Sequence, residues 1–327
     1  MNVLITGSSG FIGSHLAEEL VKKGYNVKCL VRKTSNIENL KKLGVELVYG
    51  ELTNKDSLAR AVDDVDIVYH LGAVLGSFNE PKELIWNVNV NGTKNILDES
   101  FKHGVKKFIH FSTFLVYGYT KKPANEKTPY SAPTTYYGET KRESEKIVEE
   151  YMDKGMSTVI IQPTVIHGAG LDFGFANLFK AIQDGKFMFI GNGDNLLHLG
   201  YIDNLIEGVL LASESEKAIG KKYIIGDEKP LPFKVVVGYM AGILGVKMPR
   251  IHLPEVVARV SIPPLKILSL ITAKQPILTS ERINFIVKNQ AGDISKIKNE
   301  LGFKPRISSR DGLELTIEHY KKIGFLR

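Results

Sequence analysis

Residues 2–13 read Asn-Val-Leu-Ile-Thr-Gly-Ser-Ser-Gly-Phe-Ile-Gly, and this stretch predicts how the fold begins. A short apolar run reaches Thr6, three glycines follow at intervals of three residues, and an amphipathic helical pattern continues beyond them. A strand, a glycine loop and a helix in this order build a dinucleotide-binding crossover. In such a crossover Gly7 permits the tight turn, Gly10 admits a pyrophosphate and Gly13 lets the helix pack on the strand. The same turn can also form in a protein that binds no ligand. Motifs elsewhere in the chain are therefore needed to distinguish a dinucleotide-binding loop from a simple tight turn.

Short apolar runs recur along the chain, with helical stretches between them. This alternation is typical of an α/β fold whose parallel sheet carries helices on both faces. Because crossovers between parallel strands are right-handed, we expect a doubly wound sheet. The strand-like runs span residues 2–6, 25–31, 45–49, 65–71, 107–113, 157–162 and 223–225.

Composition narrows the class of protein. The 327 residues are 43% hydrophobic and 24% charged, as in soluble globular proteins. The net charge is +7, but the lysines are scattered in pairs near expected helix ends, so we expect no nucleic-acid-binding face. The single cysteine, Cys29, excludes a disulfide within the chain, no metal-ligand cluster is visible, and no run reaches the ~18 apolar residues of a membrane span. A strand beginning at residue 2 leaves no room for a signal peptide, so we expect a reducing, cytoplasmic location.

The glycine spacing, with Thr6 before it and Phe-Ile between the last two glycines, resembles that of the extended short-chain dehydrogenase/reductases. This superfamily of NAD-dependent epimerases and dehydratases includes nucleotide-sugar epimerases, dihydroflavonol reductases and 3β-hydroxysteroid dehydrogenases. Asp293-Ile-Ser-Lys and Leu301-Gly-Phe-Lys-Pro are similar to its C-terminal motif, so the resemblance covers the whole chain. It implies a Rossmann domain and a smaller C-terminal α/β lobe that binds the substrate. The implied ranges are 1–167 with about 201–226 for the Rossmann domain, and about 168–200 with 227–327 for the substrate lobe.

The end of the second predicted strand bears on the choice of cofactor. An NAD-preferring fold usually has Asp or Glu there, about twenty residues past the glycines, to hold the ribose hydroxyls. This chain has Val31, followed by Arg32 and Lys33. A guanidinium can hold a 2′-phosphate in a bidentate contact, and the arrangement is similar to that of dihydroflavonol reductases, whose matching arginine binds NADP. We therefore predict NADP, with NAD as the alternative; an ordinary pair of surface cations would favour neither.

Further motifs of the superfamily imply a set of cofactor-binding residues. Residues 50–53 read Gly-Glu-Leu-Thr where the family has Gly-Asp-Leu-Thr, and residues 70–73 read His-Leu-Gly-Ala where it has His-Leu-Ala-Ala. Residues 89–93 match its Asn-Val-x-Gly-Thr motif. The resemblance implies cofactor contacts from Gly7, Ser9, Gly10, Phe11, Ile12, Arg32, Glu51, Leu52, Leu71, Gly72, Ala73, Asn89, Ser112, Tyr137, Lys141 and Pro163.

Tyr137 and Lys141 are four residues apart and therefore share one face of a helix. We expect the ammonium to favour the phenolate and to lower the phenol pKa, which is about 10 when unperturbed, so that Tyr137 can exchange a proton with a substrate oxygen. Thr113 ends the fifth predicted strand, where its hydroxyl can orient that oxygen. The resemblance makes Thr113, Tyr137 and Lys141 the catalytic trio and implies that Lys141 also holds the nicotinamide ribose. Tyr136 competes for the role of Tyr137 but lacks a lysine four residues later.

Departures from the family motifs limit the reactions and the substrates that we expect. Nucleotide-sugar 4,6-dehydratases have Asp-Glu after the threonine, whereas this chain has Phe114-Leu115, so we do not expect dehydration. Leu197-His198 stands where nucleotide-sugar enzymes usually have an Arg-Asp pair, and the segment reads more like hydroxysteroid and sterol-carboxylate dehydrogenases. Since a phosphate without a matching cation is costly in a pocket, a diphosphate substrate would need another clamp. The apolar residues 253–278 are either a lid over a hydrophobic substrate or a packed cap of the smaller lobe.

These observations predict an NAD(P)-dependent oxidoreductase that interconverts a secondary alcohol and a ketone, by hydride transfer, on a largely apolar or uncharged small molecule. One alternative is a nucleotide-sugar 4-epimerase that uses tightly bound NAD. A more remote one is a regulator that senses NAD(P) without catalysis. In the family, helices matching residues 82–103 and 136–154 form a two-fold interface, so we also expect a homodimer.

Overall fold

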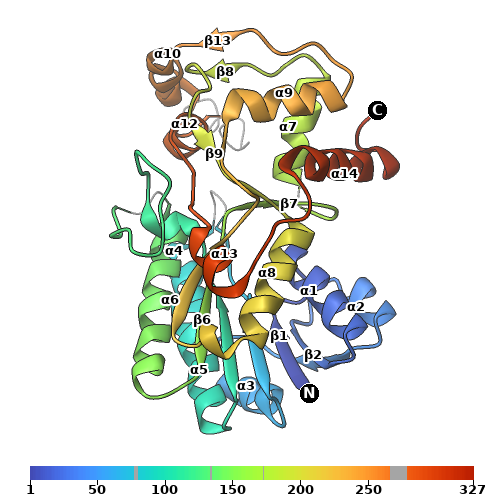
Figure 1. The fold of residues 1–327 in the computed structure, drawn as a ribbon, viewed down its shortest axis with the longest axis vertical. Helices are drawn as coiled ribbons and strands as arrows, with labels where there is room; N and C mark the ends of the chain where they lie inside the picture. The colour runs from blue at the N-terminus through green and yellow to red at the C-terminus, as the bar shows by residue number, and fades with distance from the viewer. Residues whose placement is uncertain (77–79, 133–134, 172, 266–277) are drawn as a thin grey trace.

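The structure is a computed structural model that describes residues 1–76, 80–132, 135–171, 173–265 and 278–327 (Figure 1). A large sheet covered by helices forms the lower part of the molecule in Figure 1, and a smaller lobe lies above it. The strands of the large sheet run upwards in this view, so their carboxyl ends face the smaller lobe.

The large sheet has seven strands in the order β11-β6-β5-β4-β1-β2-β3, and every neighbouring pair is parallel. The central β4 is buried along its whole length, as expected for a parallel strand that helices cover on both faces. All seven strands predicted from the sequence are present, so the predicted α/β class is confirmed. Their bounds are β1 (Asn2–Thr6), β2 (Asn26–Val31), β3 (Glu46–Tyr49), β4 (Ile67–His70), β5 (Lys107–Phe111), β6 (Thr158–Pro163) and β11 (Lys221–Ile225).

Helices pack on both faces of this sheet through two separate hydrophobic cores, so the sheet is doubly wound. One core takes residues from α1 (Phe11–Lys22), α2 (Glu38–Lys42), α8 (Ile202–Glu214) and α13 (Ser295–Leu301). The other takes residues from α3 (Lys55–Val62), α5 (Gly92–Lys102) and α6 (Tyr136–Asp153). Short helical segments complete this part of the chain: α4 (Lys82–Trp86), the π-helix η1 (Asn87–Asn91), and the 3₁₀ turns η2 (Phe114–Tyr117) and η3 (Glu216–Ala218).

The smaller lobe has its own core, built around Phe179, Phe189 and Leu313. Two further helices pack on each other at its outer end, where Ala258 and Ile283 are fully buried. The helices of the lobe are α7 (Phe173–Gln183), α9 (Phe233–Ile243), α10 (Glu255–Val260), α12 (Ser280–Val287) and α14 (Ser309–Lys322). Its short strands pair as β7 (Val165–His167) with β10 (Leu199–Tyr201), β8 (Phe189–Ile190) with β13 (His252–Leu253), and β9 (Leu196–Leu197) with β12 (Leu231–Pro232).

Two details bear on the predicted organisation. The segment around α13 returns to the large sheet, because Ile294, Ile297 and Phe303 belong to its core, although the predicted division gives that segment to the smaller lobe. The division itself stays a prediction. Of the apolar stretch 253–278, residues 266–277 lie outside the described residues, and the described part packs on α12 through Ala258. Whether that stretch is a lid or a cap therefore stays open.

Candidate active site

The glycine loop is held in a conformation that requires its glycines. Gly7 has a φ of +71°, and a Cβ added there would lie 2.8 Å from the backbone nitrogen of Gly72. A Cβ on Gly13 would lie 2.2 Å from the carbonyl oxygen of Gly7. The loop therefore packs closely against the first turn of α1 and against the chain after β4. An open space lies beside the loop.

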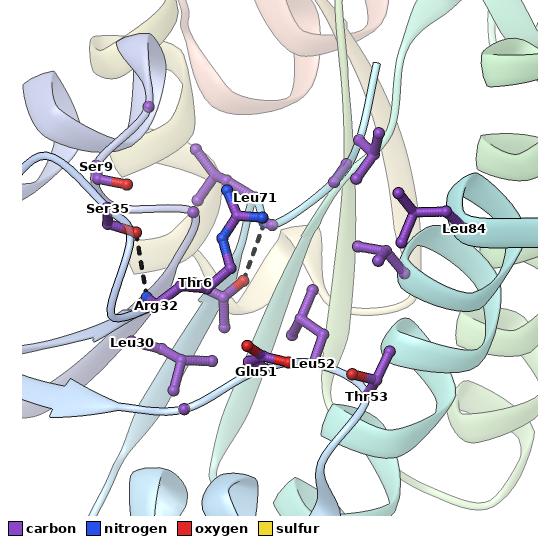
Figure 2. A pocket seen from close by; sticks show the side chains of 17 residues that line it. Thr6, Ser9, Leu30, Arg32, Ser35, Glu51, Leu52, Thr53, Leu71 and Leu84 are labelled. Carbon is purple, nitrogen blue, oxygen red and sulfur yellow. Dashed lines mark hydrogen bonds between the residues drawn. The ribbon is translucent and has the colours of Figure 1, made fainter. Parts of the chain in front are cut away.

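That space is a cavity of about 360 Å³ at the carboxyl ends of β1, β2 and β4 (Figure 2). Ligands of open α/β sheets bind in this place, and the N-terminus of α1 adds a positive dipole end for a phosphate. The predicted cofactor residues that line the cavity are Gly7, Ser9, Gly10, Arg32, Glu51, Leu52, Leu71, Gly72 and Ala73. Residues that the motifs did not identify line it as well, among them Leu30, Ser35, Val74, Leu84 and Val88.

Arg32 borders the cavity beside Ser35, whose Oγ lies 3.1 Å from the Arg32 backbone nitrogen (Figure 2). The Arg32 side chain is exposed, and its guanidinium forms no hydrogen bond or ion pair with the described residues. Val31 before it is buried, with 2% of its surface exposed, and offers no acceptor to a ribose. The charged residues that line the cavity are this arginine and the carboxylate Glu51.

Other predicted cofactor residues do not line this cavity. Asn89 is fully buried: its side chain accepts a hydrogen bond from Val74 N at 2.7 Å and donates to Val74 O at 2.9 Å. It holds the cavity wall in place through Val74, and its contact with a cofactor stays a prediction. The remaining ones lie at the start of α1, at the ends of β5 and β6, and on α6, namely Phe11, Ile12, Ser112, Pro163, Tyr137 and Lys141.

The start of α6 brings the predicted catalytic residues towards one another. The Thr135 hydroxyl caps the helix by accepting a hydrogen bond from Gly138 N at 3.0 Å. A Cβ on Gly138 would lie 3.5 Å from the carbonyl oxygen of Leu115, so the helix start packs on the turn that follows Thr113. The Thr113 hydroxyl accepts a bond from Leu115 N at 3.3 Å and is 8% exposed as a residue.

Tyr136 and Tyr137 differ in their surroundings, and the choice of Tyr137 as the catalytic tyrosine stays a prediction. Lys82 Nζ lies 4.9 Å from the centre of the Tyr136 ring, so that ring faces α4. Burial raises the pKa of Tyr137 to about 12. The expected lowering of this pKa is therefore wrong: loss of solvent around the phenol outweighs any effect of the nearby lysine.

Lys141 is buried with 1% of its surface exposed, and its amine forms no hydrogen bond or ion pair with the described residues. Burial lowers the pKa of Lys141 to about 8, and the carboxylate of Glu145 partly opposes this shift. Motif analysis did not identify Glu145, although its place one turn after Lys141 could have been a signal. Glu145 is fully buried and is held by Gln162 Nε2 at 2.8 Å and Lys222 Nζ at 3.3 Å.

Two fully buried histidines lie close to Lys141 and were not predicted as site residues. His70 ends β4 and His110 lies opposite it on β5, with ring centres 5.5 Å apart. Burial first, and then the charge of Lys141, hold the pKa of each imidazole well below its ordinary range. Both rings are therefore neutral around pH 7.

A smaller cavity of about 190 Å³ lies between the start of α6 and α12. It is lined by Leu115, Tyr119, Thr135, Glu281, Arg282, Phe285 and Gln290. His198 does not reach it as a cation, because His198 is fully buried and its Nε2 bonds to Asp227 O at 2.8 Å. Two lining residues of this second cavity, Leu115 and Thr135, lie two positions from Thr113 and Tyr137 in the sequence.

Three observations fit a nicotinamide dinucleotide. The larger cavity has a glycine cradle that a Cβ would fill, and the Arg32 guanidinium that borders it has no partner among the described residues. The buried Lys141 amine on α6 also has none among them. The described residues contain no group of three or more histidine, cysteine or carboxylate side chains that could hold a metal ion. Throughout the described ranges, no helix combines the length and apolar character needed to cross a membrane.

Similarity to known proteins agrees with this geometry. Over 322 residues the chain is 30% identical to N-acetyl-α-D-glucosaminyl-diphospho-ditrans,octacis-undecaprenol 4-epimerase of Escherichia coli O157:H7, covering 97% of this chain and 95% of the relative. It is 29% identical to the decarboxylating sterol-4-α-carboxylate 3-dehydrogenase of Mus musculus, covering 97% and 90%. The crystal structure of UDP-glucuronic acid 4-epimerase from Bacillus cereus, in complex with UDP-glucuronic acid and NAD, superposes with a TM-score of 0.80 at 25% identity and covers 99% of this chain and 100% of that one.

A match to a protein-family model assigns the chain to a family. Residues 3–226, which hold the glycine loop, the cavity and the Tyr137–Lys141 pair, match the model of the NAD dependent epimerase/dehydratase family. The solved neighbours that bind NAD do so on this same fold. The chain therefore belongs to the NAD-dependent epimerase/dehydratase family.

Proposed function

We propose that the protein is an NAD(P)-dependent oxidoreductase that interconverts a secondary alcohol and a ketone. The observation that carries the proposal is the buried Lys141 amine, which no described residue satisfies, one helical turn from Tyr137. Burying an amine away from water without a hydrogen-bond partner costs free energy, and a bound ligand that accepts its hydrogen bonds would remove that cost. The ribose hydroxyls of a nicotinamide dinucleotide are the ligand that suits this place.

Three residues of the chain would each have a separate role in the reaction. A bound nicotinamide supplies or accepts the hydride at its C4 atom. Tyr137 would exchange the proton at the substrate oxygen, and Thr113 would orient that oxygen. Lys141 would hold the ribose and, as an ammonium, stabilise negative charge that develops on the phenol.

For the substrate we propose a largely apolar or uncharged molecule. Leu115 and Phe285 line the second cavity, and the buried Leu197-His198 pair offers no cation for a phosphate. The lining also contains one cation and one carboxylate, Arg282 and Glu281.

A 4-epimerase is the second candidate, and the undecaprenol-linked sugar epimerase, at 30% identity, favours it. The same residues can remove hydride from a sugar hydroxyl and return it to the other face. The two reactions differ only in whether the cofactor changes its redox state over a complete turnover.

A substrate panel tests the proposal. The protein is incubated with NAD or NADP and a 3β-hydroxysteroid, a sterol 4-carboxylate, UDP-N-acetylglucosamine or a polyprenyl-diphospho-sugar, and both nicotinamide reduction and epimer content are measured. Net reduction supports the oxidoreductase, and epimers without net reduction support the epimerase. Tight cofactor binding with neither product would favour a non-catalytic sensor of NAD(P).

Three further parts of the assignment are proposals. The cofactor is NADP(H), because Arg32 is free to meet a 2′-phosphate. The protein is a homodimer that pairs through α5 and α6, as the family resemblance implies. It works in the cytoplasm, which suits its single buried cysteine, whose thiol pKa burial raises to about 11.

A further inference from the structure

A chain of buried hydrogen bonds runs through His70, between the wall of the larger cavity and the helix that carries Tyr137 and Lys141. On the cavity side, Gly72 N donates to Thr6 Oγ1 at 3.0 Å, and Thr6 Oγ1 lies 2.7 Å from His70 Nδ1. On the other side, His70 Nε2 lies 2.9 Å from Thr93 Oγ1, which donates to Asn89 O at 2.6 Å. All of these side chains are fully buried.

The chain reaches α6 at two residues that flank Lys141. Ser144 Oγ lies 2.7 Å from the same Asn89 carbonyl and 2.8 Å from the carbonyl oxygen of Thr140, and its single proton serves one of the two. Asn89 Nδ2 donates to Thr140 Oγ1 at 3.0 Å and to Val74 O at 2.9 Å. Thr6, Gly72 and Val74 line the larger cavity, so the wall of the cavity and the catalytic helix share one network.

The direction of each bond follows from the number of protons available. A carbonyl oxygen cannot donate, so the single proton of the Thr93 hydroxyl goes to Asn89 O. The contact between Thr93 and His70 must then be a donation from Nε2–H of the imidazole. In a neutral ring Nδ1 is then an acceptor, and it takes the proton of the Thr6 hydroxyl, whose oxygen accepts from Gly72 N.

We propose that His70 is a positioning residue, fixed as the Nε2–H tautomer, which ties the cofactor-binding wall at Gly72 to the catalytic helix α6. The neutral ring keeps every donor and acceptor in the network paired, so the wall and the helix hold a single relative position. This role rests on the proposed function, since it requires that the larger cavity bind a nicotinamide dinucleotide.

The chain contains a matched control for the Thr93 link. In the smaller lobe Thr316 Oγ1 donates to Gly312 O at 2.7 Å and lies 3.0 Å from Nδ1 of the buried His167. Thr93 and Thr316 thus have the same surroundings: a fully buried helix threonine, a bond to the carbonyl four residues earlier and a contact with a buried imidazole. Thr93→Val and Thr316→Val should lose similar stability, but only the first interrupts the link to the cavity.

Two measurements test the proposal. Heteronuclear NMR of the imidazole nitrogens in the unaltered protein should show His70 as the Nε2–H tautomer from pH 6 to pH 8; an Nδ1–H tautomer, or protonation in this range, would overturn it. Titrations with NADH and NADPH should then show about tenfold weaker binding of the preferred nucleotide to Thr93→Val, the loss typical of one buried hydrogen bond. Thr93→Ser should restore the affinity, and Thr316→Val should leave it unchanged.

The binding results distinguish the possible failures. Equal losses in Thr93→Val and Thr316→Val would mean general damage and no special role for His70. Unchanged binding in Thr93→Val would refute the link even if the tautomer were as stated. An unaltered protein that binds neither nucleotide would refute the proposed function, and this role of His70 with it.

Discussion

At the level of single residues, we predict that Arg32 and Val31 determine the cofactor preference. If Arg32 meets a 2′-phosphate, the charge-assisted contact contributes about 1.5–3 kcal/mol, which is roughly a ten- to hundredfold preference for NADPH. Arg32→Ala should then weaken NADPH binding by about that factor while NADH binding changes little. Val31→Asp should invert the preference. Fluorescence titration of both nucleotides measures this, with the exposed neighbour Lys33→Ala as the control.

Two outcomes of these titrations would contradict a contact between Arg32 and the 2′-phosphate. A guanidinium can stack on an adenine face without regard to the phosphate. Equal losses of NADH and NADPH in Arg32→Ala would indicate such stacking. Tighter binding of NADH by the unaltered protein would refute the NADP assignment.

The pKa of the Lys141 amine predicts how cofactor binding depends on pH. Its pKa is about 8, so the amine is charged below that pH and neutral above it. If the ammonium donates to ribose hydroxyls, binding favours the charged form, and affinity for NADH should fall as the pH rises from 7 towards 10. Lys141→Met should bind more weakly with a flat profile over this range, and a flat profile in the unaltered protein would contradict the contact.

At the level of elements, the contact between the glycine loop and α1 carries a stability prediction. A Cβ on Gly13 would lie 2.2 Å from Gly7 O, so Gly13→Ala must displace the loop or the helix. Such overpacking should destabilise the protein by about 1–3 kcal/mol and weaken NADH binding. A Cβ added to Gly242 on α9 would meet nothing within 4 Å, so Gly242→Ala should leave binding intact and stabilise by up to about 1 kcal/mol.

Chemical denaturation and NADH titration of both variants check this prediction. Wild-type affinity in Gly13→Ala would mean that the loop does not shape the nucleotide site. A loss of NADH affinity in Gly242→Ala would mean that the comparison reports general damage.

The elements that the sequence could predict are those encoded by neighbouring residues. Seven apolar runs gave the seven strands, and the spacing of the glycines and of Tyr137 and Lys141 gave the loop and the helix face. The contacts around Lys141 could not be predicted, because they join distant segments: His70 meets Thr93 across 23 positions, and Lys222 meets Glu145 across 77. The pKa of Tyr137 was misjudged for the same reason, since burial depends on tertiary packing.

For the whole molecule, the outer surface of α5 and α6 carries the oligomer prediction. Phe101 on α5 is 47% exposed and packs edge-to-face on Tyr151 of α6, with ring centres 5.9 Å apart. If this surface pairs two copies, the unaltered protein should sediment as a dimer at micromolar concentration, and Phe101→Glu should dissociate it because a charge would be buried without a partner. Ile323→Glu alters another exposed apolar residue, which follows α14 and is 57% exposed, and this variant should stay dimeric. A monomeric unaltered protein would contradict the expectation.

The catalytic role of Tyr137 is the central claim about the molecule, and Tyr137→Phe tests it most directly, because the change removes only the phenolic hydroxyl. Turnover of whichever substrate of the panel reacts should be measured beside the affinity for NAD(P)H. We predict that turnover falls by about a hundred- to ten-thousandfold, the usual contribution of a general acid or base, while cofactor affinity stays near that of the unaltered protein. Turnover close to the unaltered rate would show that another group moves the proton and would contradict the account.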